Sequence, residues 1–298
     1  SIPSATRKAR FSLSALRSVS RYAGGMVGIT FLAILLTQVD KIFLSILLTL
    51  SEYGYYTLAA AVAGSLSIFL TPIVQAWFPR LSELHVSNKN DEFIEMYHQG
   101  AQLVCVILGS AALVMIQYSE VILELWTRDA DLVSNASNLV KWLAFGNLLN
   151  GLMTIPYQAQ LAHGWTGYAI RVNAISLILI VPAIFWSVPK YGAIASAVIW
   201  VCLNAGYLLI GVHFMYHRIL VREKRRWYVE DILRPLAAAA VASFAFQLII
   251  PDAKAPLYQV LEIALAVIVT LASALLAAPA ISSKLKSANL FSTASHAR

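Results

Sequence analysis

Charged residues and cysteines are both scarce in this chain of 298 residues. Only 12% of the residues are Asp, Glu, Lys or Arg, whereas soluble domains carry about 25%. Hydrophobic residues reach 59%, and the mean hydropathy is +0.70. Cys105 and Cys202 both lie inside apolar runs, where we expect them to pack as small side chains and not to form a disulfide. This composition predicts an integral membrane protein.

Motifs of known catalytic centres are also missing. The sequence has no GxSxG, no CxxC and no GxxxxGK phosphate loop. His213 and His217 lie four residues apart, but no Glu follows the first His and no third ligand is evident. We therefore expect no enzyme, no metal and no cofactor. The net charge of +7 does not indicate nucleic-acid binding, because the basic residues lie between apolar runs.

Apolar runs of membrane-spanning length are what the sequence does contain. A helix needs about 20 apolar residues to cross a bilayer, and eight segments qualify: 22–50, 54–78, 97–118, 134–156, 168–187, 191–215, 232–250 and 257–280. The connections on one side hold 17 Lys and Arg residues, and those on the other side hold three. The sequence thus predicts an all-α protein with eight transmembrane helices and both termini in the cytoplasm.

A basic segment divides the chain into two groups of predicted helices. The expected organisation is a basic cytoplasmic lead-in at 1–21, a six-helix unit at 22–216, a basic cytoplasmic loop at 217–231, two additional transmembrane helices at 232–280 and a cytoplasmic tail at 281–298. The connections are too short for a soluble catalytic domain.

Polar side chains recur inside the predicted spans, and two interpretations stay open. They either form interhelical hydrogen bonds that hold the bundle together, or they line a hydrated cavity suited to a hydroxyl-rich cargo. We favour the cavity. Its candidate residues are Gln38, Asp40, Lys41, Gln75, Asn147, Asn150, Gln158, Arg171 and Asn173.

Asp40 and Lys41 interrupt the first apolar run. Each unpaired charge inside a bilayer costs about 2.5–3.5 kcal/mol. Neighbouring residues of a helix do not face each other, so the two should not pair. We expect Asp40 near the midplane, facing the cavity beside Gln38 or other amides, either as a gate or proton-coupling acid or as the cap of a helix break. Lys41 is expected to snorkel or to pair with another lobe.

Three stretches resemble a known family. Residues 37–84 contain Asp40 within a span, then the turn EYGYY and a span that ends in PRLS. Residues 154–185 and 188–200 continue the similarity, which covers most of 15–215. These stretches resemble polysaccharide and O-antigen flippases of the Wzx type, which belong to the MATE-like exporter superfamily.

The resemblance implies a fold and an activity. It implies that 22–216 is the second six-helix lobe of a two-lobe transporter, that the N-terminal lobe is missing, and that two extra helices follow. The implied activity is the flipping of undecaprenyl-pyrophosphate-linked oligosaccharide across the bacterial inner membrane. Implied partners are this lipid-linked glycan, membrane lipids, the N-terminal lobe and polysaccharide polymerase, with no nucleic acid. The extra helices are expected, by analogy, to hold the polyprenyl tail.

Three alternatives remain. A drug or cation exporter of the same superfamily would favour an aromatic and acidic cavity. A membrane glycosyl- or acyltransferase would need an acid/base cluster near one interface. The third alternative is a membrane scaffold without transport activity.

Overall fold

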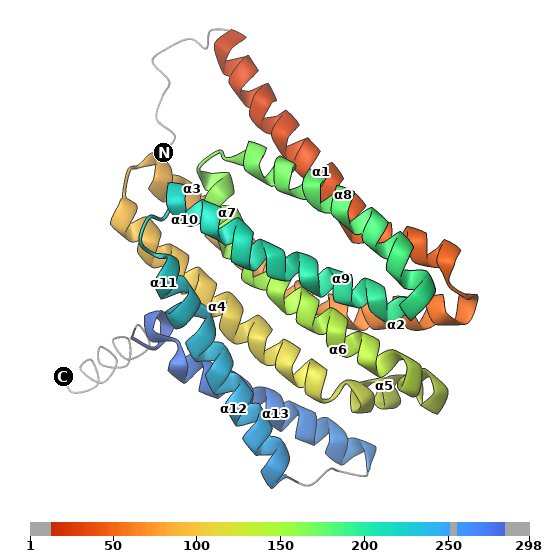
Figure 1. Ribbon diagram of the computed structural model, residues 1–298. Coiled ribbons are helices and arrows are strands. Elements are labelled where there is room, and N and C mark those ends of the chain that lie inside the picture. Colours follow the sequence, from red (N-terminus) through yellow and green to blue (C-terminus); the bar gives the residue numbers. More distant parts are fainter. Residues whose placement is uncertain (1–12, 251–254, 284–298) are drawn as a thin grey trace, which may run out of the picture.

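The computed structural model describes residues 13–250 and 255–283, and this part of the chain is helical without strands (Figure 1). The prediction of an all-α membrane protein is therefore confirmed. The helices are α1 (Leu13–Leu47), α2 (Leu50–Gly64), the 3₁₀ segment η1 (Ser65–Phe69), α3 (Leu70–Val86), α4 (Asn90–Gln117), α5 (Ser119–Thr127), α6 (Ala130–Leu152), α7 (Thr154–Ala162), α8 (Thr166–Tyr191), α9 (Ala193–Gly206), the π-helical segment η2 (Tyr207–Gly211), α10 (Val212–Arg218), α11 (Lys224–Arg226), the π-helical segment η3 (Trp227–Leu233), α12 (Arg234–Ile249) and α13 (Pro256–Ala277).

Seven helical segments of the described chain are long and apolar enough to cross a membrane. They are Ala23–Leu47, Leu50–Val86, Asn90–Gln117, Thr166–Tyr191, Ala193–Arg218, Lys224–Ile249 and Pro256–Ala277. The eighth predicted span corresponds mainly to α6, whose 23 residues would extend about 34 Å. α6 lies within the bundle against α2, α4 and α9, but its Asn residues and Lys141 lower its hydropathy. The count of eight spans therefore stays a prediction.

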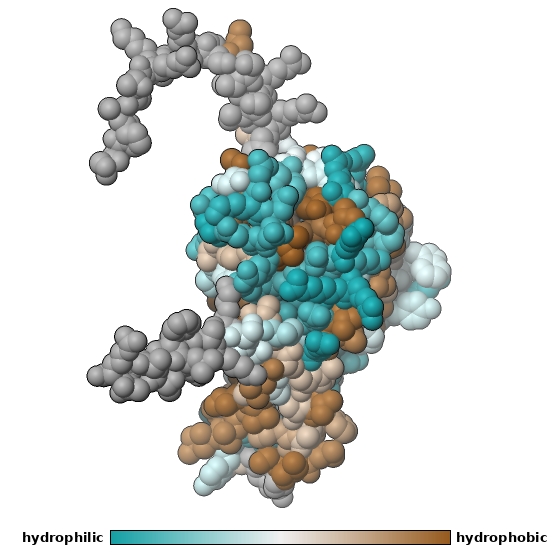
Figure 2. Space-filling view, turned by 90° about the vertical axis from the view of Figure 1, so that its left-hand side faces the viewer, coloured by the Kyte–Doolittle hydropathy of each residue, from teal (hydrophilic) through white to brown (hydrophobic). Residues whose placement is uncertain are grey.

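The long helices run back and forth, so their connections gather at two ends of the bundle (Figure 1). One end holds the connections 87–89, 163–165 and 219–223. Hydrophilic side chains cover this end, where α3, α10 and α11 lie (Figure 2). We call it the basic end, because Lys89, Arg218 and Arg222 lie there. Under the positive-inside rule it is the predicted cytoplasmic side.

The path from Leu50 to Val86 is one long helix with a local irregularity. Thr49 begins it with a capping box, in which its side chain accepts from the Glu52 N–H and Glu52 accepts from the Thr49 N–H. The tighter 3₁₀ segment η1 comes just before Pro72. Proline lacks an N–H, and its ring clashes with the carbonyl four residues earlier. That carbonyl belongs to Ile68, which explains why the helix changes its winding there.

The last two helices pack on the outside of α4. α12 and α13 form a helical hairpin whose two members both contact α4, and Figure 1 places them on the opposite side of α4 from α1 and α8. Residues 224–231, expected within the basic loop 217–231, are instead helical and lead directly toward α12. The expectation failed because Lys224, Arg225 and Arg226 make this first turn look like a loop, whereas Trp227 and Asp231 just beyond it are buried.

Candidate functional site

A cavity of about 840 Å³ lies between the helices of the bundle that precede α12 and α13. Its walls come from α1, α2, η1, α3, α6, α7, α8, α9 and η2. Apolar side chains form most of the wall, for example Leu36, Ile180 and Leu203. The described residues of α12 and α13 contribute nothing to the lining. The C-terminal hairpin thus lies away from the cavity.

Eight of the nine predicted cavity residues line this one space: Gln38, Asp40, Lys41, Gln75, Asn147, Asn150, Gln158 and Asn173. They come from α1, α3, α6, α7 and α8, so the fold brings together residues up to 135 positions apart. Arg171 does not line the cavity. Its side chain is exposed, and its Nε donates to the Gly167 carbonyl at 3.1 Å.

Asp40 lies in the cavity wall near the end opposite to the basic end, where it forms a polar contact between helices. The Tyr56 hydroxyl donates to Asp40 Oδ2 at 2.5 Å and lies 3.5 Å from Ser196 Oγ. Asp40 Oδ1 is buried and accepts no hydrogen bond from the residues that the structure describes. Tyr56 is only 1% exposed, so this contact is shielded from solvent.

Asp40 lies in the last third of α1. α1 continues to Leu47, so Asp40 lies about 10 Å from that end by helical rise and not at the middle of a 35-residue helix. The expected depth of Asp40 near the membrane midplane stays a prediction. The hydrogen-bond partner of Asp40 is the Tyr56 hydroxyl, which sequence reasoning missed, although Tyr56 belongs to the EYGYY motif.

Lys41 does not neutralise Asp40 by a direct ion pair within the described chain. Its Nζ donates instead to Gln38 Oε1 at 3.4 Å, one turn back on α1. This arrangement follows from the helix geometry, which points adjacent side chains about 100° apart and brings residues three apart together.

Part of the amide set connects helices. Asn147 Nδ2 donates to the Ala63 carbonyl at 2.9 Å, and its Oδ1 accepts from Trp200 Nε1 at 2.8 Å. Asn150 Nδ2 donates to Asn204 Oδ1 at 2.7 Å. These contacts join α6 to α2 and α9. For Asn147 and Asn150, the interpretation as structural hydrogen-bonding groups therefore applies in addition to their place on the cavity wall.

The remaining amides are free to bind something else. Gln75, Gln158 and Asn173 line the cavity and make no side-chain hydrogen bond to any part of the chain that the structure describes. Gln75 lies past the middle of the continuous helix Leu50–Val86, and Asn173 lies in the first half of α8, so both are in the halves nearer the basic end. Gln158 lies on α7, which contacts α3 and α10. The cavity is thus chemically asymmetric, with free amides toward the basic end and Asp40 toward the other.

A helical, multi-pass membrane protein whose internal cavity carries polar side chains on a mostly apolar wall has the architecture of a membrane transporter. Residues 5–85 match the family described as polysaccharide biosynthesis protein. A Shigella flexneri protein named as an O-antigen transporter is 24% identical over 179 residues, which cover 60% of this chain and 42% of the relative. These matches confirm the predicted relationship to polysaccharide flippases of the Wzx type.

The chain thus spans less than half the length of the curated relative that it matches. No solved structure matches the chain.

Proposed function

We propose that this chain is one lobe of a transporter that flips an undecaprenyl-pyrophosphate-linked oligosaccharide across the bacterial inner membrane. The observation that supports this proposal best is the set of free amides of Gln75, Gln158 and Asn173 inside a bundle of apolar helices. Amides both donate and accept hydrogen bonds. They therefore suit the hydroxyl groups of a sugar, which need new hydrogen-bond partners once the sugar leaves water.

The asymmetry of the cavity suggests an order of events. A glycan entering from the predicted cytoplasmic side meets the free amides first, because they lie toward the basic end. Asp40 and Tyr56 lie farther along the path and act as a gate near its exit. Rocking of this lobe against a second lobe would then expose the cavity to each side in turn. The polyprenyl tail stays in the lipid and needs no polar site.

A drug or cation exporter is the second candidate. The unpartnered Oδ1 of Asp40 favours it, because a buried carboxylate oxygen attracts a cationic cargo. Against it, Asp40 is the sole carboxylate on the cavity wall within the described chain, and Lys41 lies beside it. The amides outnumber the acid, so the glycan is the better match.

The proposal is tested in cells that lack their own glycan flippase. The chain is expressed alone and together with the N-terminal lobe of the Shigella flexneri relative, and surface glycan is measured against membrane protein abundance. We expect export only when both lobes are present. Failure of the pair while both lobes accumulate and associate would contradict the proposal, as would resistance to cationic drugs without glycan export.

A further inference from the structure

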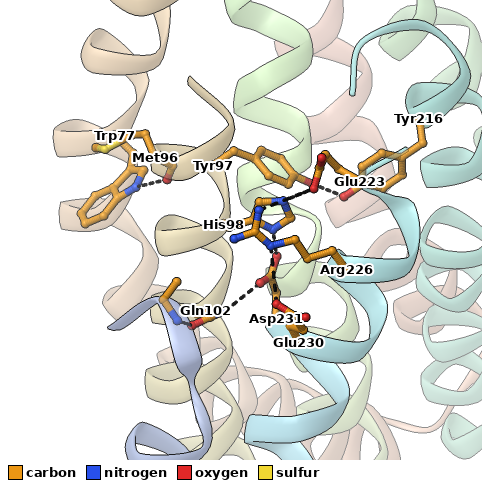
Figure 3. Close-up of polar contacts among 11 residues, drawn as sticks. Trp77, Met96, Tyr97, His98, Gln102, Tyr216, Glu223, Arg226, Glu230 and Asp231 are labelled. Carbon is orange, nitrogen blue, oxygen red and sulfur yellow. Dashed lines mark hydrogen bonds and ion pairs between the residues drawn. The ribbon is translucent and has the colours of Figure 1, made fainter. Parts of the chain in front are cut away.

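A second polar cluster lies inside the bundle, away from the cavity (Figure 3). Its centre is His98 on α4, whose Nδ1 contacts Asp231 Oδ2 on η3 and whose Nε2 lies 3.0 Å from Glu223 Oε2. The side chains of His98 and Asp231 are 0% exposed, and that of Glu223 is 21% exposed. His98, Asp231 and Glu223 are called the triad below.

The number of protons in the triad follows from its geometry. An ionised carboxylate only accepts hydrogen bonds, and a neutral imidazole has one N–H and one bare nitrogen. Both ring nitrogens of His98 face carboxylate oxygens. With a neutral ring and two ionised carboxylates, one of these contacts would place a lone pair against a negative oxygen. One additional proton removes this repulsion.

The surroundings indicate that the additional proton is on the ring. Asp231 Oδ1 accepts from Gln102 Nε2 at 2.9 Å, and Glu223 Oε2 lies 3.7 Å from Arg226 Nη1. Both carboxylates therefore face other donors, which favour the ionised form and oppose the effect of burial on Asp231. An imidazolium between them leaves the triad with one net negative charge. Arg226 lies beside this charge and is shared between Glu223 and Glu230.

Other titratable groups next to the triad have contacts of their own. The hydroxyl groups of Tyr97 on α4 and Tyr216 on α10 lie 2.7 Å apart and bond to each other. Cys105 on α4 donates to the Ile232 carbonyl at 3.5 Å. Glu230 pairs with Arg226 at 3.5 Å. Within the described chain, no group of three or more His, Cys, Asp or Glu residues could hold a metal ion. A proton is therefore the occupant that the geometry fits.

We propose that the triad is a proton-binding site that fastens the C-terminal hairpin to α4. The contacts join α4 to the helix that leads into α12, and Gln102 extends them by accepting from the Ala280 N–H at 2.8 Å, just beyond α13. Glu223 is the partly exposed member and gives protons access from the basic end. The fastening therefore depends on pH at the predicted cytoplasmic side. This inference does not rest on transport activity.

The sign of the pH dependence follows from proton linkage. In the unfolded chain above about pH 7, histidine is neutral and carboxylates are ionised. The folded triad then holds one proton more than the unfolded chain, so the folded state loses stability as pH rises. The unfolding equilibrium constant should increase by up to about tenfold per pH unit between about pH 7 and the pH at which the triad releases its proton.

The first experiment measures thermal unfolding of the full chain in detergent from about pH 6 to about pH 9. We compare the wild type with Glu223→Gln, in which the amide can donate to a neutral ring, so no additional proton is needed. Glu120→Gln is the matched control, because Glu120 pairs with Lys141 at 2.8 Å while 64% exposed. The wild type and the control should lose stability as pH rises, and Glu223→Gln should show a flatter profile.

A second measurement reads the proton directly and does not need a stable variant. In protein labelled with nitrogen-15 at its six histidines, His98→Gln assigns the His98 ring signals. The wild type should show both ring nitrogens protonated at about pH 8, where an exposed histidine is neutral. A neutral His98 ring at that pH, or pH profiles of the wild type and Glu223→Gln that superimpose, would overturn the proposal.

Discussion

At the scale of single residues, Asn147 and Gln75 line the same cavity but use their amides differently. Asn147 is bonded to α2 and α9, whereas Gln75 makes no bond to the described chain. A substitution at Asn147 should therefore lower stability, whereas a substitution at Gln75 should reduce transport and leave stability unchanged.

We predict that Asn147→Ala lowers stability by about 1–2 kcal/mol, because it leaves the Trp200 N–H and the Ala63 carbonyl without their partner. Gln75→Ala should leave stability unchanged and reduce glycan export in the two-lobe protein. Thermal unfolding and surface glycan are measured for both variants. Equal effects of the two substitutions on stability would contradict the division into bonded and free amides.

Asp40→Asn should reduce glycan export strongly while membrane abundance stays near normal. The new amide oxygen can still accept from the Tyr56 hydroxyl, so the contact between α1 and α2 survives, but the charge is lost. Surface glycan is measured relative to protein abundance. Wild-type export would exclude Asp40 from the mechanism, and loss of the protein would indicate a structural role. Thr57→Ala on α2 serves as a control away from the cavity lining.

At the scale of helices, close contacts depend on individual glycines. A Cβ on Gly151 of α6 would meet Leu108 Cδ2 of α4 at 2.0 Å. A Cβ on Gly54 of α2 would meet nothing within 4 Å. The same substitution thus tests the packing at one position and helix propensity at the other.

Gly151→Ala should destabilise the bundle by about 1–3 kcal/mol, because tightly packed helices must move apart to admit the methyl group. Gly54→Ala should be neutral or stabilising, since alanine is the better helix former. Thermal unfolding of both variants checks this. An unchanged stability of Gly151→Ala would mean that α4 and α6 are packed less tightly than described.

Hydropathy predicted the long helices well, and the rule that polar residues inside spans mark a cavity identified eight of the polar residues that line it. Sequence could not show which amides are bonded, because the partners are distant along the chain: Asn147 and Trp200 are 53 residues apart. It also missed the burial of His98 and Asp231, which are 133 residues apart. Such contacts depend on how helices cross, and local composition does not contain that information.

At the scale of the whole molecule, α6 decides the topology. α5 lies at the end opposite to the basic end, and 219–223 lies at the basic end (Figure 1). If α6 crosses the membrane, these two segments are on opposite sides. If α6 does not cross, only α8 and α9 cross the membrane between the two segments. Since these two helices run in opposite directions, α5 and 219–223 would then lie on the same side.

Trp126→Cys and Val221→Cys make a matched pair, because the native side chains are 61% and 62% exposed. Both are introduced with Cys202→Ala, since Cys202 is exposed and Cys105 is buried. An impermeant thiol reagent applied outside intact cells should label position 126 alone, and position 221 only after permeabilisation. Labelling of both positions from outside would show that α6 does not cross the membrane. The reverse pattern would show that the predicted orientation is inverted.

The long sequence separation within the triad also affects how the chain is made. During synthesis, α4 enters the membrane well before the ribosome reaches Asp231, since 132 residues lie between His98 and its carboxylate partner. Until then, His98 has neither acid beside it in the bundle. The bundle thus lacks this contact until η3 and α12 have been made. A quality-control protease that recognises exposed intramembrane polar groups could therefore distinguish chains that stop before Asp231 from longer ones.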